Sequence, residues 1–230
     1  MTGIIGAMSV EVEGLKAKIE NARAEVISGI EFVSGRLCGA PVVVAQCGIG
    51  KVFAAVCAQT MVLRYGVKRI INTGVAGTLS DKIGILDFAV SSGVVQHDMD
   101  TTAIGDAPGL ISGINIVEIK AAPALCELVV RLAREQGSNA VSGVIASGDQ
   151  FINNADKKAY IRDTFGAIAC EMEGAAIGHV AYISGVDFVI IRCISDNASG
   201  EADMEYPEMV SRAAVKSQAL VEAILTEVCD

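Results

Sequence analysis

The 230-residue chain has no tryptophan, only two histidines and four prolines, and an aromatic content of 4%. Hydrophobic residues still make up 52% of it, so the predicted core is aliphatic. The scarcity of histidine and the lack of any C-x-x-C spacing argue against a zinc site. We expect neither a metal nor a cofactor.

The chain also lacks a basic stripe and a long apolar run. Its net charge is −9 and its Lys and Arg residues are scattered, so we expect no nucleic acid and no membrane as partner. No run reaches the roughly 18 apolar residues of a membrane span. No basic segment precedes the N-terminal apolar run, so no signal peptide is expected. The odd number of cysteines, seven, mostly among apolar residues, is typical of reduced thiols in the cytoplasm.

Apolar runs alternate with helical patterns along the whole chain. The patterns predict strands at 3–8, 24–37 (a hairpin), 41–47, 68–74, 87–95, 139–147 and 187–196. They predict helices at 10–21, 48–65, 121–136, 155–164, from about 170 onward, and 204–228. Residues 98–119 have no clear period and predict a long loop. This order favours an α/β fold, a three-layer αβα sandwich with a mixed central sheet, in a single domain covering 1–230.

Ligands of such sheets bind beyond the C-terminal ends of the strands, which directs attention to four polar segments. Glu11 follows the first strand, and the segment N-T-G-V-A-G, 72–77, follows another. The glycines there predict a turn whose amides at Ala76 and Gly77 lie close to a ligand. A helix-dipole role for Glu11 and a plain tight turn are the simpler alternatives.

The other two segments are S-G-D-Q-F-I, 147–152, and R-C-I-S-D, 192–196. In the first, Asp149 ends a strand and Phe151 offers a ring for stacking, although a helix cap and a core side chain explain them equally well. In the second, an arginine inside an apolar strand needs a carboxylate partner. Asp196 then emerges at the strand end, where it could also be a simple helix cap.

Two glutamates, Glu171 and Glu173, stand in a stretch that is otherwise apolar or small. A buried glutamate needs a partner. If the segment is helical, residues two apart lie about 200° apart, so the two side chains cannot both face one site. We therefore expect one of them in a pocket and the other against a buried partner such as Arg192. Glu13, next to Glu11, is assigned to solvent.

Six blocks occur together in order and spacing: G-I-I-G-A-M-x-x-E at 3–11, C-G-I-G-K-V at 47–52, I-N-T-G-x-A-G at 71–77, S-G-D-x-F-I at 147–152, E-M-E at 171–173 and R-x-I-S-D at 192–196. With them the chain closely resembles the bacterial 5′-methylthioadenosine/S-adenosylhomocysteine nucleosidases, of the purine nucleoside phosphorylase-like superfamily. The resemblance covers essentially all 230 residues.

The resemblance implies hydrolysis of an N-glycosidic bond with release of adenine. It assigns Asp196 as the acid that protonates adenine N7 and Glu11 as the base that activates water. Binding residues implied for the substrate are Phe151 and Ile152 at adenine, Met172 and Glu173 at the ribose, Arg192 near the water and Glu11, and Ser195, Ala76 and Gly77 around them. Glu171 would support the site from behind.

The resemblance also implies a homodimer, in which the 98–119 loop reaches the neighbouring subunit's 5′-substituent pocket. Two departures bear on the site. Val75 stands where some members have serine, and Ile104 where some have an aromatic residue. We therefore expect the water to depend more on Glu11 and Arg192, and the preference among 5′-substituents stays open.

Three other functions remain as alternatives. A nucleoside phosphorylase needs several basic groups around phosphate, whereas this chain offers the anionic Glu11. A hydrolase of aminodeoxyfutalosine or a related nucleoside fits the same acid and base. A non-catalytic nucleoside-binding protein would need neither Glu11 nor Asp196.

Overall fold

The computed structural model describes residues 1–196 and 206–228, but not the side chains of Asp196 and Tyr206. The strands are β1 Thr2–Gly6, β2 Glu20–Ile27, β3 Ile30–Leu37, β4 Ala40–Gln46, β5 Arg69–Thr78, β6 Phe88–Gln96, β7 Ile119–Lys120, β8 Ala140–Ser147, β9 Ala167–Glu171 and β10 Asp187–Asp196. The helices are α1 Ser9–Lys16, α2 Lys51–Tyr65, α3 Pro123–Glu135, α4 Ala155–Phe165, α5 Gly174–Ser184 and α6 Tyr206–Glu227, with a 3-10 turn, η1, at Thr102–Ile104.

All these strands belong to one mixed sheet, as predicted, in the order β10-β6-β8-β9-β5-β1-β4-β3-β2, with β7 beside β6. Strand β5 is parallel to β1 and β10 and antiparallel to β9. Because β10 pairs with both β5 and β6, the strands β5, β10, β6, β8 and β9 form a closed circuit. This closure, with β1 paired to β5, brings the ends of β1, β5, β9 and β10 together.

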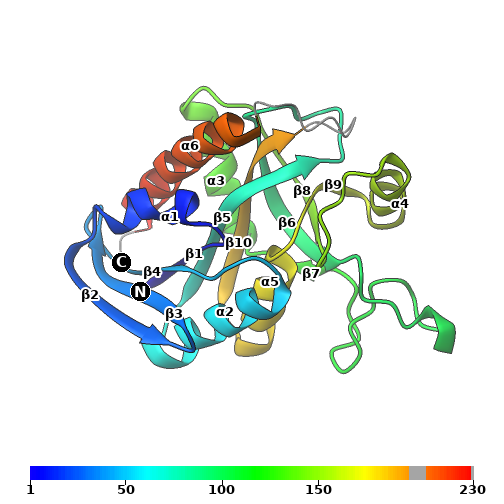
Figure 1. The fold of residues 1–230 in the computed structure, drawn as a ribbon, viewed down its shortest axis with the longest axis horizontal. Helices are drawn as coiled ribbons and strands as arrows, with labels where there is room; N and C mark the ends of the chain where they lie inside the picture. Colours follow the sequence, from blue (N-terminus) through cyan, green and yellow to red (C-terminus); the bar gives the residue numbers. More distant parts are fainter. Residues whose placement is uncertain (197–205, 229–230) are drawn as a thin grey trace.

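Helices cover both faces of the sheet, which confirms the predicted three layers (Figure 1). Successive strand residues point to opposite faces, so neighbours join different cores. Ile5 and Ile70 pack in the cluster that contains α2 and α5, whereas Ile4 and Ile71 pack in the cluster that contains α1, α3 and α6. The core is aliphatic, as its composition predicted.

The segment between β6 and α3 projects away from the body of the molecule (Figure 1). The loop predicted at 98–119 is confirmed for most of this length, with η1 as a short turn inside it. Its end is different from the prediction, because Ile119 begins strand β7 and pairs with Val94.

Three predicted elements are wrong in their bounds or type. The first helix ends at Lys16 rather than near 21, because Glu20 already pairs with Arg36 of β3. The turn predicted at 72–77 is part of β5, where Gly74 pairs with Arg192 and Gly77 with Cys170.

The third error concerns the segment around Glu171. Residues Ala167–Glu171 form strand β9, parallel to β8 and antiparallel to β5, and α5 begins only at Gly174. Small residues in this strand are buried on both sides, so its sequence has no period of two. The argument from helical geometry for Glu171 and Glu173 therefore does not apply.

Candidate active site

A cavity of about 130 Å³ lies where the ends of β1, β5, β9 and β10 meet. This is the place that the rule for open α/β sheets selects. Seven of the predicted site residues line it: Glu11, Ala76, Gly77, Phe151, Met172, Glu173 and Ser195. Val75, Cys170 and Glu171 lie in the same wall.

Glu11 is buried, and among the described residues its hydrogen bonds come from backbone amides. Its Oε2 accepts hydrogen bonds from the amides of Ala7 (2.7 Å) and Met8 (2.9 Å), and its Oε1 accepts one from Val75 (3.2 Å). Burial raises the pKa of this carboxyl group. The three backbone hydrogen bonds and, separately, the positive charge of Arg192 oppose that rise. A buried carboxyl group with a raised pKa, on the wall of a cavity, is suited to act as a general base.

Gly74 of β5 leaves space for the carboxylate of Glu11. A Cβ atom on Gly74 would lie 2.6 Å from Glu11 Oε1, so no larger residue fits on β5 at this point. The second glycine of the N-T-G-V-A-G segment, Gly77, pairs with Cys170 in the sheet. Gly74 therefore permits close packing around a carboxylate, and both glycines belong to strand β5 in place of the predicted turn.

Glu171 is the buried carboxylate that pairs directly with a positive charge, the guanidinium group of Arg192. It accepts hydrogen bonds from Arg192 Nη2, from the Ser147 hydroxyl, and from the amides of Glu173 and Gly174. Arg192 is only 2% exposed and belongs to β10. The predicted pairing of one glutamate with Arg192 is confirmed, and Glu171 is that glutamate.

Arg192 lies behind the cavity and is not among the residues that line it. Its Nη2 also donates to Asn72 Oδ1 (2.5 Å), and its Nη1 donates to the carbonyl of Ile191 (3.1 Å). Burial by itself lowers the pKa of the guanidinium group, but the surrounding carboxylates, Glu171 first, outweigh it and the net shift is upward. No hydrogen bond joins Arg192 to Glu11 among the described residues.

Glu173 is the second carboxylate at the cavity. It is buried at the start of α5, its Oε1 accepts a hydrogen bond from the Gly50 amide (2.8 Å), and its Oε2 lies 3.9 Å from Arg192 Nη2. Burial, with the negative charge of Glu171 as the next cause, raises the pKa of this group to about 7. Glu173 thus titrates near neutrality, whereas Glu171 has the closer bond to the guanidinium.

Phe151, Ile152 and Asp196 belong to segments next to the cavity. Phe151 is 60% exposed, which makes its ring available for stacking. Ile152 lines a smaller adjoining cavity of about 40 Å³ together with Phe151 and Met172. The backbone of Asp196 ends β10 beside Gly77, and its side chain lies outside the described residues. Glu13 is exposed, as predicted.

Sequence reasoning missed several residues that position the site. Asn72 accepts a hydrogen bond from Arg192 and donates one to the carbonyl of Ile5 (2.9 Å). The Ser147 hydroxyl donates to Glu171 and accepts from the amide of Ala175. A polar residue inside each of two apolar strands was the available signal. Asp149 does cap a helix, but the helix is α2, since its Oδ1 accepts from the Lys51 amide.

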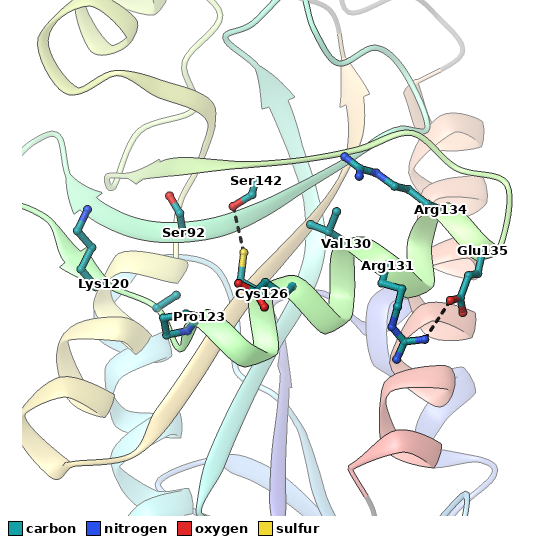
Figure 2. Close-up of a pocket in the computed structure, with 11 residues that line it drawn as sticks. Ser92, Lys120, Pro123, Cys126, Val130, Arg131, Arg134, Glu135 and Ser142 are labelled. Carbon is teal, nitrogen blue, oxygen red and sulfur yellow. Dashed lines mark hydrogen bonds and ion pairs between the residues drawn. The ribbon is translucent and has the colours of Figure 1, made fainter.

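A second and larger cavity, of about 830 Å³, lies beside α3 and the outer face of β6 and β8 (Figure 2). Its lysine and arginine side chains are already engaged. Arg131 pairs with Glu135, Lys120 pairs with Glu118, and Arg134 donates to a backbone carbonyl. No predicted site residue lines this cavity, so we assign the chemistry to the smaller one.

Residues 1–196 and 206–228 contain neither a cluster of metal ligands nor a membrane-spanning helix. Nowhere in these ranges do three or more His, Cys, Asp or Glu residues gather as a metal site would require. In the same ranges, no helix combines the length and the apolar character that crossing a membrane requires.

Residues 2–226 match the model of the phosphorylase superfamily. The chain is 38% identical over 226 residues to the 5′-methylthioadenosine/S-adenosylhomocysteine nucleosidase of Shewanella halifaxensis, with 98% of each chain covered. It also resembles the structure of the nucleosidase of that name from Neisseria meningitidis in complex with methylthio-immucillin-A, with 34% identity, 99% of each chain covered and a TM-score of 0.93. The structure of a futalosine hydrolase mutant of Helicobacter pylori is similar as well, with 32% identity, 99% coverage of each chain and a TM-score of 0.92. The chain therefore belongs to the phosphorylase superfamily and, within it, to the family of the 5′-methylthioadenosine/S-adenosylhomocysteine nucleosidases.

Proposed function

We propose that this enzyme hydrolyses the N-glycosidic bond of 5′-methylthioadenosine and S-adenosylhomocysteine and releases adenine. The observation that carries the proposal is the buried carboxylate of Glu11, held by three amides on the cavity wall, within a chain that matches the nucleosidases from end to end. Such an activity belongs to methionine salvage and to the recycling of by-products of S-adenosylmethionine.

The reaction breaks the bond between ribose C1′ and adenine N9 and joins C1′ to a water oxygen. Glu11 accepts a proton from that water, and Asp196 donates a proton to N7, so that adenine leaves as a neutral base. The transition state resembles an oxocarbenium ion, which needs an acid on the leaving side and a base at the water. The amides on Glu11 keep its carboxylate aligned for this step.

Glu173 and the backbone of Met172 bind the ribose hydroxyls in this proposal. A carboxylate near the ring gains binding energy as positive charge develops on the sugar. Phe151 stacks on adenine, the main chain of Ile152 contacts its Watson–Crick edge, and Ala76, Gly77 and Ser195 complete the wall. Arg192 acts through Glu171 and Glu173, since it pairs with both carboxylates but does not itself line the cavity.

The absence of basic groups at this cavity favours water over phosphate as the nucleophile. No Lys or Arg is among the described residues that line it. Phosphate binding needs several such donors. Three carboxylates surround the only described guanidinium nearby, that of Arg192.

A second candidate substrate is aminodeoxyfutalosine. The likeness to the futalosine hydrolase of Helicobacter pylori is as extensive as that to the methylthioadenosine nucleosidases, and the same acid and base would serve. Specificity between these substrates lies in the pocket for the 5′-substituent.

We also propose that residues 1–230 form one domain and that two copies associate as a homodimer in the cytoplasm. On α2 an apolar surface is uncovered, with Val52 75% and Leu63 78% exposed and Phe53 between them in the helix. An exposed apolar patch of this kind is typical of an interface. The projecting 98–119 loop would then reach the neighbouring 5′-substituent pocket.

The test uses purified protein with 5′-methylthioadenosine in phosphate-free buffer, with adenine measured by chromatography, beside an Asp196→Asn variant and an arm with phosphate. We expect adenine and free methylthioribose without phosphate, and loss of turnover in the variant. Turnover only with phosphate would make the enzyme a phosphorylase. Adenine released only from aminodeoxyfutalosine would select the second candidate, and no release from any substrate would leave a nucleoside-binding protein.

A further inference from the structure

Three residues from three separate segments form a ring of hydrogen bonds beside the cavity. The amide of Lys51, the first residue of α2, donates to Asp149 Oδ1 (2.8 Å), and the amide of Asp149 donates to Asp98 Oδ2 (2.9 Å). Lys51 Nζ closes the ring by donating to Asp98 Oδ1 (2.6 Å). We call Lys51, Asp98 and Asp149 the α2 ring.

The ion pair in this ring is partly withdrawn from solvent. The side chains of Lys51 and Asp98 are 19% and 16% exposed, so water and salt screen their attraction less than at an open surface. Burial by itself would raise the pKa of Asp98, but the bonds from Lys51 and from the Asp149 amide outweigh it and hold the pKa below its usual value. Gln96 Oε1 is a further acceptor for Lys51 Nζ (3.3 Å).

Two members of the ring, Lys51 and Asp149, are close in sequence to residues that contact or form the proposed active site. Gly50, directly before Lys51, donates its amide to Glu173 Oε1, and Phe151 follows Asp149 by two residues. Gly50 has φ of +103°, and a Cβ atom there would lie 3.1 Å from Asp149 Oδ1. The backbone at Gly50 is therefore held in a conformation that favours glycine and aims its amide at Glu173.

We propose that the α2 ring positions the ribose carboxylate and the adenine-stacking ring for the reaction. Lys51, Asp98 and Asp149 are positioning residues: they hold the Gly50 amide on Glu173 and set the loop that carries Phe151. This inference rests on the proposed function, because it takes Glu173 and Phe151 as substrate-binding residues. Since Asp98 also opens the projecting 98–119 loop, the ring connects that loop to the site of its own subunit.

The test compares Asp98→Asn and Lys51→Met with Lys18→Met, which removes a more exposed ion pair, Lys18 to Glu222 at 2.5 Å, between the turn after α1 and helix α6. The first two variants should lose about 10- to 100-fold in kcat/KM, because a misplacement of about 1 Å costs this much. The loss should fall mainly on KM, since Glu173 and Phe151 bind the substrate before reaction. Lys51→Arg keeps the cation and should recover most of the loss.

A second readout does not depend on activity. In full-length protein with ¹⁵N-labelled glycine, the Gly50 amide signal is followed against pH and reports the titration of Glu173. Losing the Gly50 hydrogen bond removes an interaction that favours the carboxylate, so the midpoint should rise in Asp98→Asn and Lys51→Met. It should stay at the wild-type value in Lys18→Met.

Wild-type KM and an unchanged Gly50 midpoint in Asp98→Asn would overturn the inference. If that variant does not fold, the pair Lys51→Met and Lys51→Arg decides: equal KM values and equal midpoints for both would overturn it too. A wild-type enzyme that releases no adenine would instead refute the proposed function, and the Gly50 titration would still show whether the ring sets Glu173.

Discussion

The two cavities of this molecule differ in size and in the way their charges are balanced. The cavity beside α3 has a volume of about 830 Å³, and its arginine and lysine side chains are paired or bonded to the backbone. The cavity at the ends of β1, β5, β9 and β10 has about 130 Å³, yet three buried carboxylates adjoin one guanidinium there. Incomplete compensation of buried charge, rather than volume, marks the site of chemistry.

Within the small cavity the carboxylates are also held differently. Among the described residues, Glu11 accepts hydrogen bonds from backbone amides, and Glu171 pairs with the guanidinium group of Arg192. Glu173 accepts a hydrogen bond from the Gly50 amide and lies 3.9 Å from that guanidinium group. The three residues therefore differ in what their removal should change. Four substitutions test this contrast.

The largest effect is expected for Glu11→Gln. The amide oxygen still accepts from the amides of Ala7 and Met8, but the side chain no longer accepts a proton from water. We expect kcat to fall by about 10²- to 10⁴-fold, the usual contribution of a general base, with little change in KM. Steady-state release of adenine measures it. A kcat within tenfold of wild type would remove Glu11 from the role of base.

The next effect is on stability, in Arg192→Met. Removing one partner of a buried ion pair leaves Glu171 uncompensated and should cost about 3–5 kcal/mol. Urea unfolding measures the change. The double variant Glu171→Gln with Arg192→Met is the control and should be less destabilised, because no unpaired charge remains. Equal losses in single and double variants would contradict a role of Arg192 as the counter-charge of Glu171.

A smaller and pH-dependent effect is expected for Glu173→Gln. Because the pKa of Glu173 is raised to about 7, the native state binds more protons than the unfolded state between about pH 4.5 and 7. The free energy of unfolding therefore falls as pH rises through this window, by up to about 3 kcal/mol. Glutamine removes that loss, so the variant should gain on wild type from pH 5 to 8. Parallel stability curves for the two proteins would contradict the raised pKa.

The smallest effect is expected for Arg131→Met in the large cavity. The Arg131 side chain is 48% exposed and pairs with Glu135 and Glu227, and exposed pairs contribute about 0–1 kcal/mol. Adenine release should match wild type, and the midpoint of urea unfolding should shift little. Loss of activity without loss of stability would show that the two cavities are linked and would contradict the assignment of the chemistry to the small cavity alone.

Much of the fold could be predicted from local sequence. Apolar runs bounded by glycine predicted most strands, and the pairing of a glutamate with Arg192 followed from the cost of burying either charge alone. Strand β9 could not be predicted, because A-I-A-C-E has no alternation and becomes a strand only through its partners β8 and β5. The extension of β5 through N-T-G-V-A-G has the same cause, since its glycines pair with β10 and β9.

The aliphatic core, the alternation of strands and helices, and the need of the buried carboxylates for partners all follow from composition and from spacing along the chain. The identity of each carboxylate's partner follows from the three-dimensional arrangement of the strands. Glu171 lies 21 residues from Arg192, Glu11 lies 64 residues from Val75, and Glu173 lies 123 residues from Gly50. Strand pairing in the sheet brings these segments together, and a contact across such separations leaves no period in the sequence.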